Sequence, residues 1–386
     1  MGGGLMQLVA YGAQDIYLTG NPQITFFKVV YRRHTNFSME AIEQTWNGSA
    51  TTAGRCTATI SRNGDLVHRM YLEVSGTPVA GADNLSAIVD SIELEIGGQK
   101  IDKHSGKWME VWAELTEPNP TGMVGQHDET GGTTFQLMSG MGGMEGAASA
   151  GRWFIPLQFW FCRNPGLALP LIALQYHEVK VILTHIIDTV IDTNTTNQLW
   201  ADYIYLDTDE RRRFAQVSHE YLIEQVQEQS LSTTGTTHEL NFNHPVKELI
   251  WAASTGASGT LAGSTLVIPA TQGTTYHLKL NGHDRFAARD SRYFSRVQVW
   301  SHHSGPGGLN STAQDDGTGH NDSICVYSFA LKPEEHQPSG TCNFSRIDNA
   351  QLVGSIALTG ANPHIYAVNY NVLRIMSGMG GLAYSN

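Results

Sequence analysis

The chain has 386 residues, which exceeds one ordinary domain and suggests two or three, of which two is the economical choice. It contains 40 glycines but only 16% charged residues, so short elements joined by many turns are favoured, and we predict an all-β protein. The formal net charge of -12 argues against direct nucleic-acid binding, because that function needs clustered lysine and arginine.

The N-terminal stretch combines apolar side chains with almost no charge. Up to Phe27 its only charged residue is Asp15. We predict an arm over residues 1–23 and a first strand over Ile24–Tyr31, where β-branched and aromatic residues crowd together. The apolar side chains of the arm need a cover of protein or lipid. They form the candidate assembly site, which comprises Leu5, Leu8, Val9, Tyr11, Ile16, Tyr17 and Leu18.

Turn signals predict two hairpins after the arm. Arg55–Arg62 and Leu66–Ser75 read as strands, and Asn63-Gly64 between them is a signal for a tight hairpin. Apolar and acidic residues alternate over Ser91–Ile96, and Gly97-Gly98 then turns the chain into a second hairpin.

A change of period predicts a short helix between Ser105 and Thr116. Apolar side chains recur there at spacings of three and four residues, namely at Trp108, Val111, Trp112 and Leu115. Ser105 is placed to cap the start of the helix, and Pro118 is placed to stop it.

The rest of the first half is predicted to be a long surface loop followed by strands. The loop, Glu117–Gly151, holds nine glycines. Strands are expected at Trp153–Phe161, Tyr176–Thr184 and Leu199–Leu206. A charge cluster after Leu206 places the boundary near residue 215, which gives domains of 24–215 and 216–386.

The second half repeats part of the first. IELEIGGQKID and MEVWAEL match YHLKLNGHDRF and SRVQVWSHH, with Gly98 and Gly282 in corresponding places at an offset of 184 residues. This repeat favours two copies of one fold. The second half has its own Gly-rich loops at Ser254–Ser264 and Ser301–Asp322. Its expected strands are Val246–Ala252, Arg296–Trp300, Ile324–Leu331 and Tyr366–Met376.

The candidate catalytic and metal-binding residues form no recognised motif. No HxH pair occurs among the 16 histidines, and we interpret His302-His303 as surface residues of a Gly-rich loop. Asp207 and Asp209 resemble a metal-binding DxD, but the arginines at 211–213 favour intramolecular ion pairs. Nucleophile-elbow, phosphate-loop and HExxH patterns are also absent. We predict no enzyme, no cofactor and no metal.

The cysteines and the N-terminus indicate the compartment. Cys56, Cys162, Cys325 and Cys342 form no CxxC pair and are interpreted as reduced, mostly buried thiols. The start of the chain lacks the basic and apolar regions of a secretory signal, and no apolar run approaches the length of a membrane span. We expect a soluble protein that is made in the cytosol.

Five blocks, spread in order over the whole chain, resemble one family. They are the stretch at 8–38, PLQFWFCRNPGLALPLIALQYHEVKVIL at 156–183, LDTDERRRF at 206–214 with HEYLIEQVQ after it, YSFALKPEEHQPSGTCNFSRID at 327–348, and NYNVLRIMSGMGGLAYSN at 369–386. The set is similar to the major capsid proteins of the nucleocytoplasmic large DNA viruses. The resemblance implies a double jelly roll, two eight-stranded β-sandwich barrels in tandem, with short helices in the loops.

The same resemblance implies function and partners. It points to homotrimeric, pseudo-hexagonal capsomers that assemble into an icosahedral virion shell in the host cytoplasm. The implied partners are neighbouring capsomers, minor capsid and penton proteins, and an internal viral membrane. The loops of this chain are short for the family, so we expect a low outer surface, and receptor binding by this chain is in doubt.

Other functions fit the sequence less well. A carbohydrate-binding jelly roll would expose aromatic residues in its loops, but the three long loops hold only Phe135. A minor capsid or penton-type component remains an alternative within the same family. A cupin-like enzyme is third, since it needs metal ligands that this chain lacks.

Overall fold

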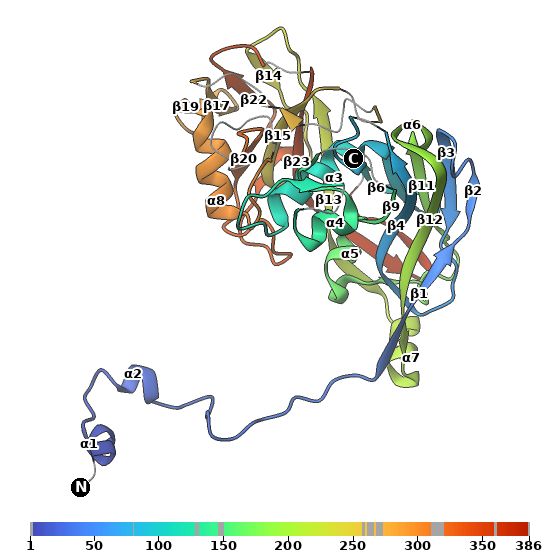
Figure 1. The fold of residues 1–386 in the computed structure, drawn as a ribbon. Coiled ribbons are helices and arrows are strands. Elements are labelled where there is room, and N and C mark those ends of the chain that lie inside the picture. Colours follow the sequence, from blue (N-terminus) through green and yellow to red (C-terminus); the bar gives the residue numbers. More distant parts are fainter. Residues whose placement is uncertain are drawn as a thin grey trace. The chain divides into compact units, whose positions relative to one another are not determined.

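The computed structural model describes residues 3–79, 81–127, 131–145, 150–256, 259–260, 266–267, 273–309, 320–358 and 361–384. The chain forms two compact units, Met1–Asn36 and Phe37–Asn386, which we call the arm and the body. Strands dominate the body, as Figure 1 shows.

The arm contains two short helices and no strand among its described residues. The helices are α1 (Gly3–Val9) and α2 (Ile16–Thr19), and neither buries a residue. The prediction of a first strand over Ile24–Tyr31 is therefore wrong. β-branched residues favour a strand where a neighbouring strand accepts and donates the backbone hydrogen bonds. The first paired strand is instead β1 (Phe37–Gln44).

The first half of the body consists of two antiparallel sheets around one core. One sheet has the order β1-β12-β4, with β9 and β10 both paired to β4, and the other has the order β2-β3-β11-β5-β6. Leu72 and Leu199 from the first sheet share a core with Leu94 and Val181 from the second. The strands other than β1 are β2 (Trp46–Gly48), β3 (Gly54–Thr59), β4 (Leu66–Pro78), β5 (Val89–Ile96), β6 (Gln99–Ser105), β9 (Gly151–Pro156), β10 (Leu169–Pro170), β11 (Val179–His185) and β12 (Ile191–Leu206). A small parallel pair joins β7 (Gly125–Gln126) to β8 (Met144–Glu145).

The second half of the body has the same construction. One sheet has the order β13-β23-β15-β16, with β20 and β21 paired to β15 and β24 paired to β23. The other has the order β14-β22-β17-β18, with β19 paired to β17. Trp251 and Ile365 from the first sheet meet Tyr276 and Leu352 from the second in one core. The strands are β13 (His219–Ser230), β14 (Thr237–Glu239), β15 (Pro245–Ser254), β16 (Leu266–Val267), β17 (Thr275–Leu280), β18 (His283–Asp284), β19 (Arg289–Asp290), β20 (Ile324–Ser328), β21 (Cys342–Asn343), β22 (Ala350–Gly354), β23 (Ala361–Met376) and β24 (Met379–Leu382).

The predicted internal repeat is confirmed by strand register. In the first half Ile96 pairs with Gln99, and in the second half Leu280 pairs with His283, so both partners are displaced by the predicted 184 residues. The turns also match, because Gly98 and Gly282 have positive φ values of 84° and 79°. Only residues that tolerate a left-handed backbone make such a tight turn.

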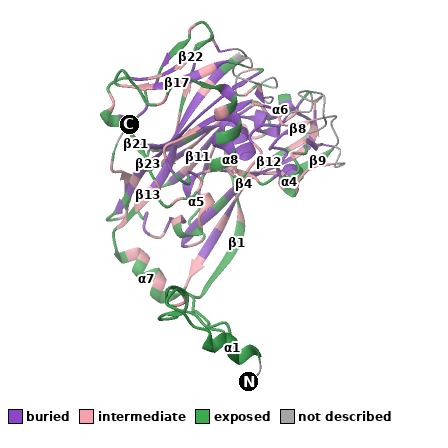
Figure 2. Cartoon of the chain, turned by 90° about the vertical axis from the view of Figure 1, so that its left-hand side faces the viewer, coloured by how far each residue is buried: buried purple, intermediate pink, exposed green. Residues whose placement is uncertain are grey.

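Helices fill the connections between strands. The predicted helix is confirmed as α3 (Gly106–Thr116), and the Ser105 side chain accepts a hydrogen bond from the Trp108 backbone N–H at 3.2 Å. Figure 2 shows burial concentrated in the sheets, whereas α7 buries no residue. The other helices are α4 (Thr134–Ser139), α5 (Trp160–Arg163), α6 (Ile187–Val190), α7 (Thr208–Gln216) and α8 (Gln298–His302), with single turns η1 (Leu85–Ile88), η2 (Pro165–Leu167), η4 (Tyr293–Val297) and η6 (Phe344–Arg346). None of the helices in the described part of the chain is long and apolar enough to cross a membrane.

The predicted hairpin at Asn63-Gly64 is wrong. β3 pairs with β2 and β11, whereas β4 pairs with β12, β9 and β10, so the chain crosses between the two sheets at this point. Gly64 has a different role, because a Cβ there would lie 2.8 Å from the Cβ of Tyr203. Close packing of this crossing against Tyr203 of β12, rather than a hairpin turn, requires this glycine.

Two of the predicted strands are partly or wholly helical. Trp153–Phe161 is a strand only as far as Pro156 and continues into α5 with Trp160 and Phe161 buried. Arg296–Trp300 lies in η4 and α8. Short apolar runs do not distinguish a buried strand from a buried helical turn.

The long loop Glu117–Gly151 is not simply a surface loop. It contains α4, which begins with a capping box between Thr133 and Gln136, and Gln136 is buried. Residues 128–130 and 146–149 of this loop lie outside the described residues, as do parts of the loops at 254–264 and 301–322. The expectation of a low outer surface concerns mainly those residues, so it also lies outside the described part of the chain.

Candidate assembly surfaces

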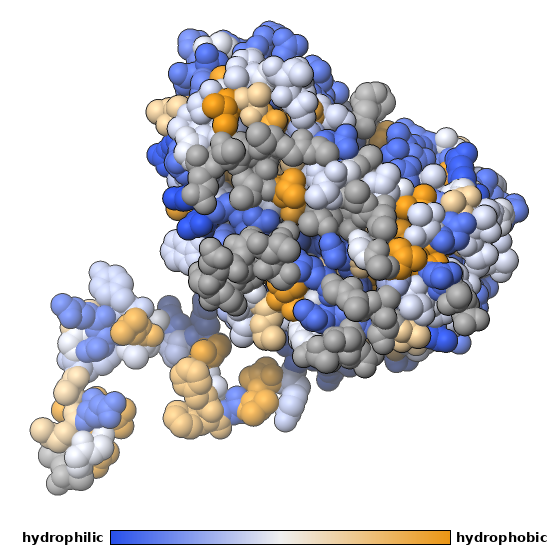
Figure 3. Space-filling view, turned by 45° about the horizontal axis from the view of Figure 1, so that its top comes forward, coloured by the Kyte–Doolittle hydropathy of each residue, from blue (hydrophilic) through white to orange (hydrophobic). Residues whose placement is uncertain are grey.

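The predicted assembly residues of the arm are all exposed. Within the arm, Leu8 is 77% exposed, Tyr17 91% and Leu18 86%, and the other four are at least 54% exposed. Figure 3 shows hydrophobic side chains gathered along the arm. Sequence reasoning missed the six that follow, because their β-branched run was interpreted as a strand. These are Ile24, Phe26, Phe27, Val29, Val30 and Tyr31, each at least 70% exposed.

The arm and the body differ in charge. The arm carries three cations, Lys28, Arg32 and Arg33, and one acid, Asp15. Because the whole chain has a net charge of -12, this leaves the body at -14. A cationic, apolar arm is suited to an acidic protein surface.

Helix α3 of the first half packs against a sheet of the second half. Trp108, Val111, Trp112 and Leu115 share a buried cluster with residues of β15, β20 and β23. The ring of Trp108 lies 5.1 Å from that of Tyr366, measured between centroids. The guanidinium of Arg163 lies over the Trp112 ring, with its Cζ 4.3 Å from the ring centroid. The four apolar positions that predicted the helix therefore face the other half of the body.

Buried charges lie beside this contact. Glu224 accepts hydrogen bonds from Lys247 Nζ at 2.7 Å and from Arg163 Nη1 at 2.9 Å, and His336 Nδ1 lies 3.4 Å away. Burial raises the pKa of Glu224, but His336 and these two cations outweigh burial and lower it to about 2. Arg163 belongs to the first half and Lys247 to the second, so this carboxylate links the halves.

Two glutamates on α3 form a buried pair. Glu110 Oε1 accepts hydrogen bonds from the N–H groups of Gly142 and Gly143, both at 2.9 Å, and Glu114 Oε2 accepts one from Leu309 N at 2.7 Å. The other oxygens, Glu110 Oε2 and Glu114 Oε1, are buried and accept no hydrogen bond from an N–H group of the described residues. The two carboxyls also interact with each other. Burial raises the pKa of Glu110 to about 7 and, together with the charge of Glu110, raises that of Glu114 well above its ordinary value.

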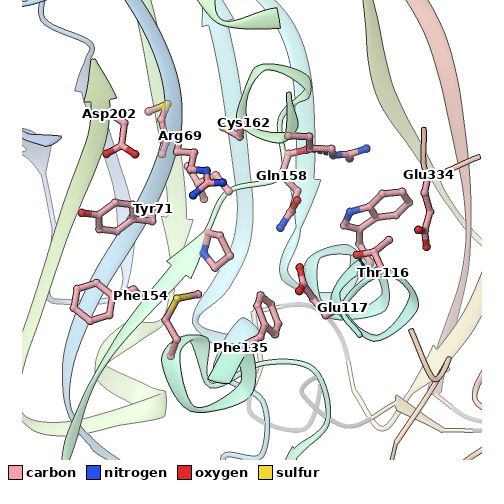
Figure 4. A pocket seen from close by; sticks show the side chains of 16 residues that line it. Arg69, Tyr71, Thr116, Glu117, Phe135, Phe154, Gln158, Cys162, Asp202 and Glu334 are labelled. Atoms are coloured by element: carbon pink, nitrogen blue, oxygen red, sulfur yellow. Dashed lines mark hydrogen bonds between the residues drawn. The ribbon is translucent and has the colours of Figure 1, made fainter. Parts of the chain in front are cut away.

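A hollow of about 640 Å³ opens beside α3, on the outer face of the sheet that contains β4. Figure 4 shows Tyr71, Phe154, Arg69 and Asp202 on one side of it and Phe135 across from them. Burial raises the pKa of Asp202, while Arg69 opposes that effect. The hollow is therefore lined by aromatic rings with a partly desolvated carboxylate among them.

The candidate metal and catalytic residues have structural roles. His303 is not a surface residue as predicted, because its buried ring lies between Glu248 at 3.0 Å and Glu334 at 3.1 Å. Burial lowers its pKa, but the two carboxylates prevail and raise it to about 9. Asp207 caps α7. Within the described ranges, no group of three or more His, Cys, Asp or Glu side chains is arranged to hold a metal ion.

The predicted ion pairs of the arginine cluster are confirmed. Arg211 Nε contacts Asp65 at 2.9 Å, and Arg213 contacts Glu210 at 3.3 Å. The four cysteines are free thiols, with Cys56 and Cys325 buried and the other two half-buried.

Two family models match consecutive parts of the chain. The model described as "Major capsid protein N-terminus" matches residues 25–209, and that described as "Large eukaryotic DNA virus major capsid protein" matches residues 210–381. The major capsid protein of Pyramimonas orientalis virus is 52% identical, and that of Paramecium bursaria Chlorella virus 1 is 42% identical, each over 100% of both chains. The crystal structure of PBCV-1 VP54 is 38% identical with a TM-score of 0.76, covering 94% of this chain and all of VP54.

Two tandem pairs of facing antiparallel sheets, matched by these structures, define a double jelly-roll capsid protein. The Faustovirus major capsid protein, at 13% identity and a TM-score of 0.61, shares the fold. The chain belongs to the major capsid proteins of large eukaryotic DNA viruses. It is thus a structural component of a virion capsid, in a family of structural proteins rather than enzymes.

Proposed function

We propose that this protein forms homotrimers that act as pseudo-hexagonal capsomers and assemble into an icosahedral shell. The observation that carries the proposal is the internal repeat, because two similar barrels in one chain give six similar barrels around a threefold axis. The similarity to a chain in the PBCV-1 virus capsid model, 38% identical with a TM-score of 0.75, supports it.

We infer that the chain consists of an arm, a first jelly roll that ends near residue 215 and a second jelly roll of 216–386. The expected division between residues 23 and 24 is replaced by one at Phe37, which is supported by the separate unit Met1–Asn36 and by β1 as the first paired strand. The second boundary is supported by the strands, since the sheets of the first half end at Leu206 and those of the second begin at His219, with α7 between them. The change of family model at residues 209 and 210 supports the same region.

The arm is proposed to contact neighbouring subunits through Leu5, Leu8, Val9, Tyr11, Ile16, Tyr17 and Leu18. The exposed apolar surface of these residues, and the positive charge that Lys28, Arg32 and Arg33 give to the unit Met1–Asn36, fit the acidic body of another copy. The further partners that we propose are minor capsid and penton proteins and an internal viral membrane, with assembly in the host cytoplasm. These follow from membership of the family.

Mass measurement in solution tests the trimer. At micromolar concentration we expect a species of three times the 42.2 kDa chain mass. Concentrating this species should give shell or sheet assemblies that are visible by electron microscopy. A stable monomer over the whole range of concentrations would contradict the proposal.

A further inference from the structure

Helix α3 has a counterpart in the second half. Both follow the hairpin that carries the repeat, and Val111-Trp112 in α3 matches Val299-Trp300 in α8. The two tryptophans have opposite environments. Trp112 is 4% exposed, because α3 packs on the sheet of the second half, whereas Trp300 is 84% exposed.

Two further exposed apolar side chains lie on, or at the end of, the helical segment that carries Trp300. Val297, one turn earlier, is 47% exposed. Leu331 is 77% exposed, and its carbonyl oxygen lies 3.3 Å from Nδ1 of His302, at the end of α8. We call Val297, Trp300 and Leu331 the knob. An 84% exposed tryptophan flanked by apolar side chains is typical of an unoccupied protein contact.

The surface that receives α3 also has a counterpart. In the second half, Ile250 of the central strand β15 pairs with Tyr366 on one side and Val326 on the other, and all three are buried with α3. In the first half, the central strand β4 has the corresponding place. There Tyr71 pairs with Trp200 of β12 and with Pro156 of β9.

In the first half this outer face is open. Tyr71 lies in the wall of the 640 Å³ hollow, with Phe154 6.0 Å away between ring centroids, and both rings are only partly buried. An aromatic side chain of the size of tryptophan buries roughly 150–250 Å² when it is covered. The hollow is thus an aromatic-lined space on the face where, in the second half, α3 is packed.

An unpaired arginine lies beside the knob, and unpaired carboxylates line the hollow. Arg292 and Arg296 are exposed on the same helical segment as the knob; Arg296 pairs with Asp322 at 2.7 Å, whereas Arg292 has no acid within ion-pair distance among the described residues. The hollow is lined by Asp202 and Glu117, together with Glu334, Arg69 and Arg163. Burial raises the pKa of Asp202 and of Glu117, and Arg69 partly opposes the effect on Asp202. Neither carboxylate has an ion-pair partner within 4.0 Å in the described part of the chain. Arginine is well suited to approach such partly desolvated carboxylates.

We propose that the knob of one copy inserts into the hollow of a second copy, so that α8 makes between chains the contact that α3 makes within one chain. This inference rests on the proposed trimer and identifies its interface. The contact joins two different surfaces, so it is heterologous and closes into a ring when the rotation between copies fits. In a trimer, three contacts between the two barrels of one chain then alternate with three contacts between barrels of different chains. Together they give six similar contacts between barrels.

Replacing the central side chain of the knob tests the pairing. Trp300→Ala should raise the trimer dissociation constant by at least about 30-fold, as for an interface hot spot. The melting temperature of the monomeric variant should equal that of the monomeric wild type, because Trp300 is exposed. Tyr176→Ala is the matched control, since Tyr176 is 75% exposed but belongs to neither the knob nor the hollow. The trimer dissociation constant of this variant should equal that of the wild type. Mass photometry over a dilution series measures both variants.

Photo-crosslinking locates the receiving surface. With p-benzoylphenylalanine at position 300, irradiation of the trimer should join two chains, and mass spectrometry should find the link at Tyr71, Phe154 or their sequence neighbours. Links to another region, or an unchanged dissociation constant for Trp300→Ala, would overturn the pairing while the trimer stands. A wild-type protein that remains monomeric would overturn the proposed function, and the pairing with it.

Discussion

Glu114→Gln should stabilise the protein at alkaline pH but not at mildly acidic pH. In the folded chain Glu110 and Glu114 interact in a fully buried place, and Glu145 adds further negative charge near Glu114. In the unfolded chain both carboxyls titrate near their ordinary values. Between about pH 4.5 and pH 7 the folded state therefore holds protons that the unfolded state releases.

The sign and the size of the effect follow from this difference. Because the folded state binds more protons, the free energy of unfolding falls as pH rises through that range, and it remains low above it. The pKa of Glu114 is raised well above its ordinary value, so this carboxyl keeps its proton in the folded chain at pH values where the unfolded chain has released it. Each pH unit over which this holds lowers the free energy of unfolding by about 1.4 kcal/mol. A glutamine at position 114 retains an oxygen for Leu309 N–H and offers an amide donor to Glu110. The variant should equal the wild type in free energy of unfolding near pH 5 and exceed it by up to about 4 kcal/mol near pH 8, because about three pH units separate the two conditions.

Urea unfolding at pH 5 and pH 8, at one protein concentration, measures this difference. Glu178→Gln is the control, since its side chain is 65% exposed, and we expect changes below about 0.5 kcal/mol at both pH values. An equal difference in free energy of unfolding between Glu114→Gln and the wild type at both pH values would refute the raised pKa of Glu114. A variant that is less stable than the wild type at pH 8 would do the same.

Two further changes test other parts of the structure. Deletion of residues 1–20 should leave a folded trimer with a nearly unchanged melting temperature but weaken assembly into shells, because the arm residues are exposed and add little to the body core. Electron microscopy of assemblies, together with calorimetry, checks this, and either loss of folding or normal assembly would contradict it. Lys247→Met should lower the free energy of unfolding by about 3–5 kcal/mol, because it removes a buried partner of Glu224. Denaturant unfolding measures the loss, and exposed Lys332→Met, whose side chain is 66% exposed, should change stability by less than about 1 kcal/mol.

The amino-acid sequence alone determined the features that depend on local signals. Glycine content and low charge predicted the β class, and the spacing of Trp108, Val111, Trp112 and Leu115 predicted α3. The turns at Gly98 and Gly282 predicted the repeat, because a positive φ restricts which residues can stand there. Five blocks along the chain were sufficient to indicate the family.

Only the tertiary structure decided which of these segments are paired and buried. Ile24–Tyr31 has strong strand propensity, but a strand needs a partner, and the described chain supplies none to it. Asn63-Gly64 has the residues of a hairpin, yet it crosses between sheets. Trp112 and Trp300 occur in matching sequence, but one is buried and the other exposed, because burial depends on residues that are distant in the chain or, by our inference, in another copy.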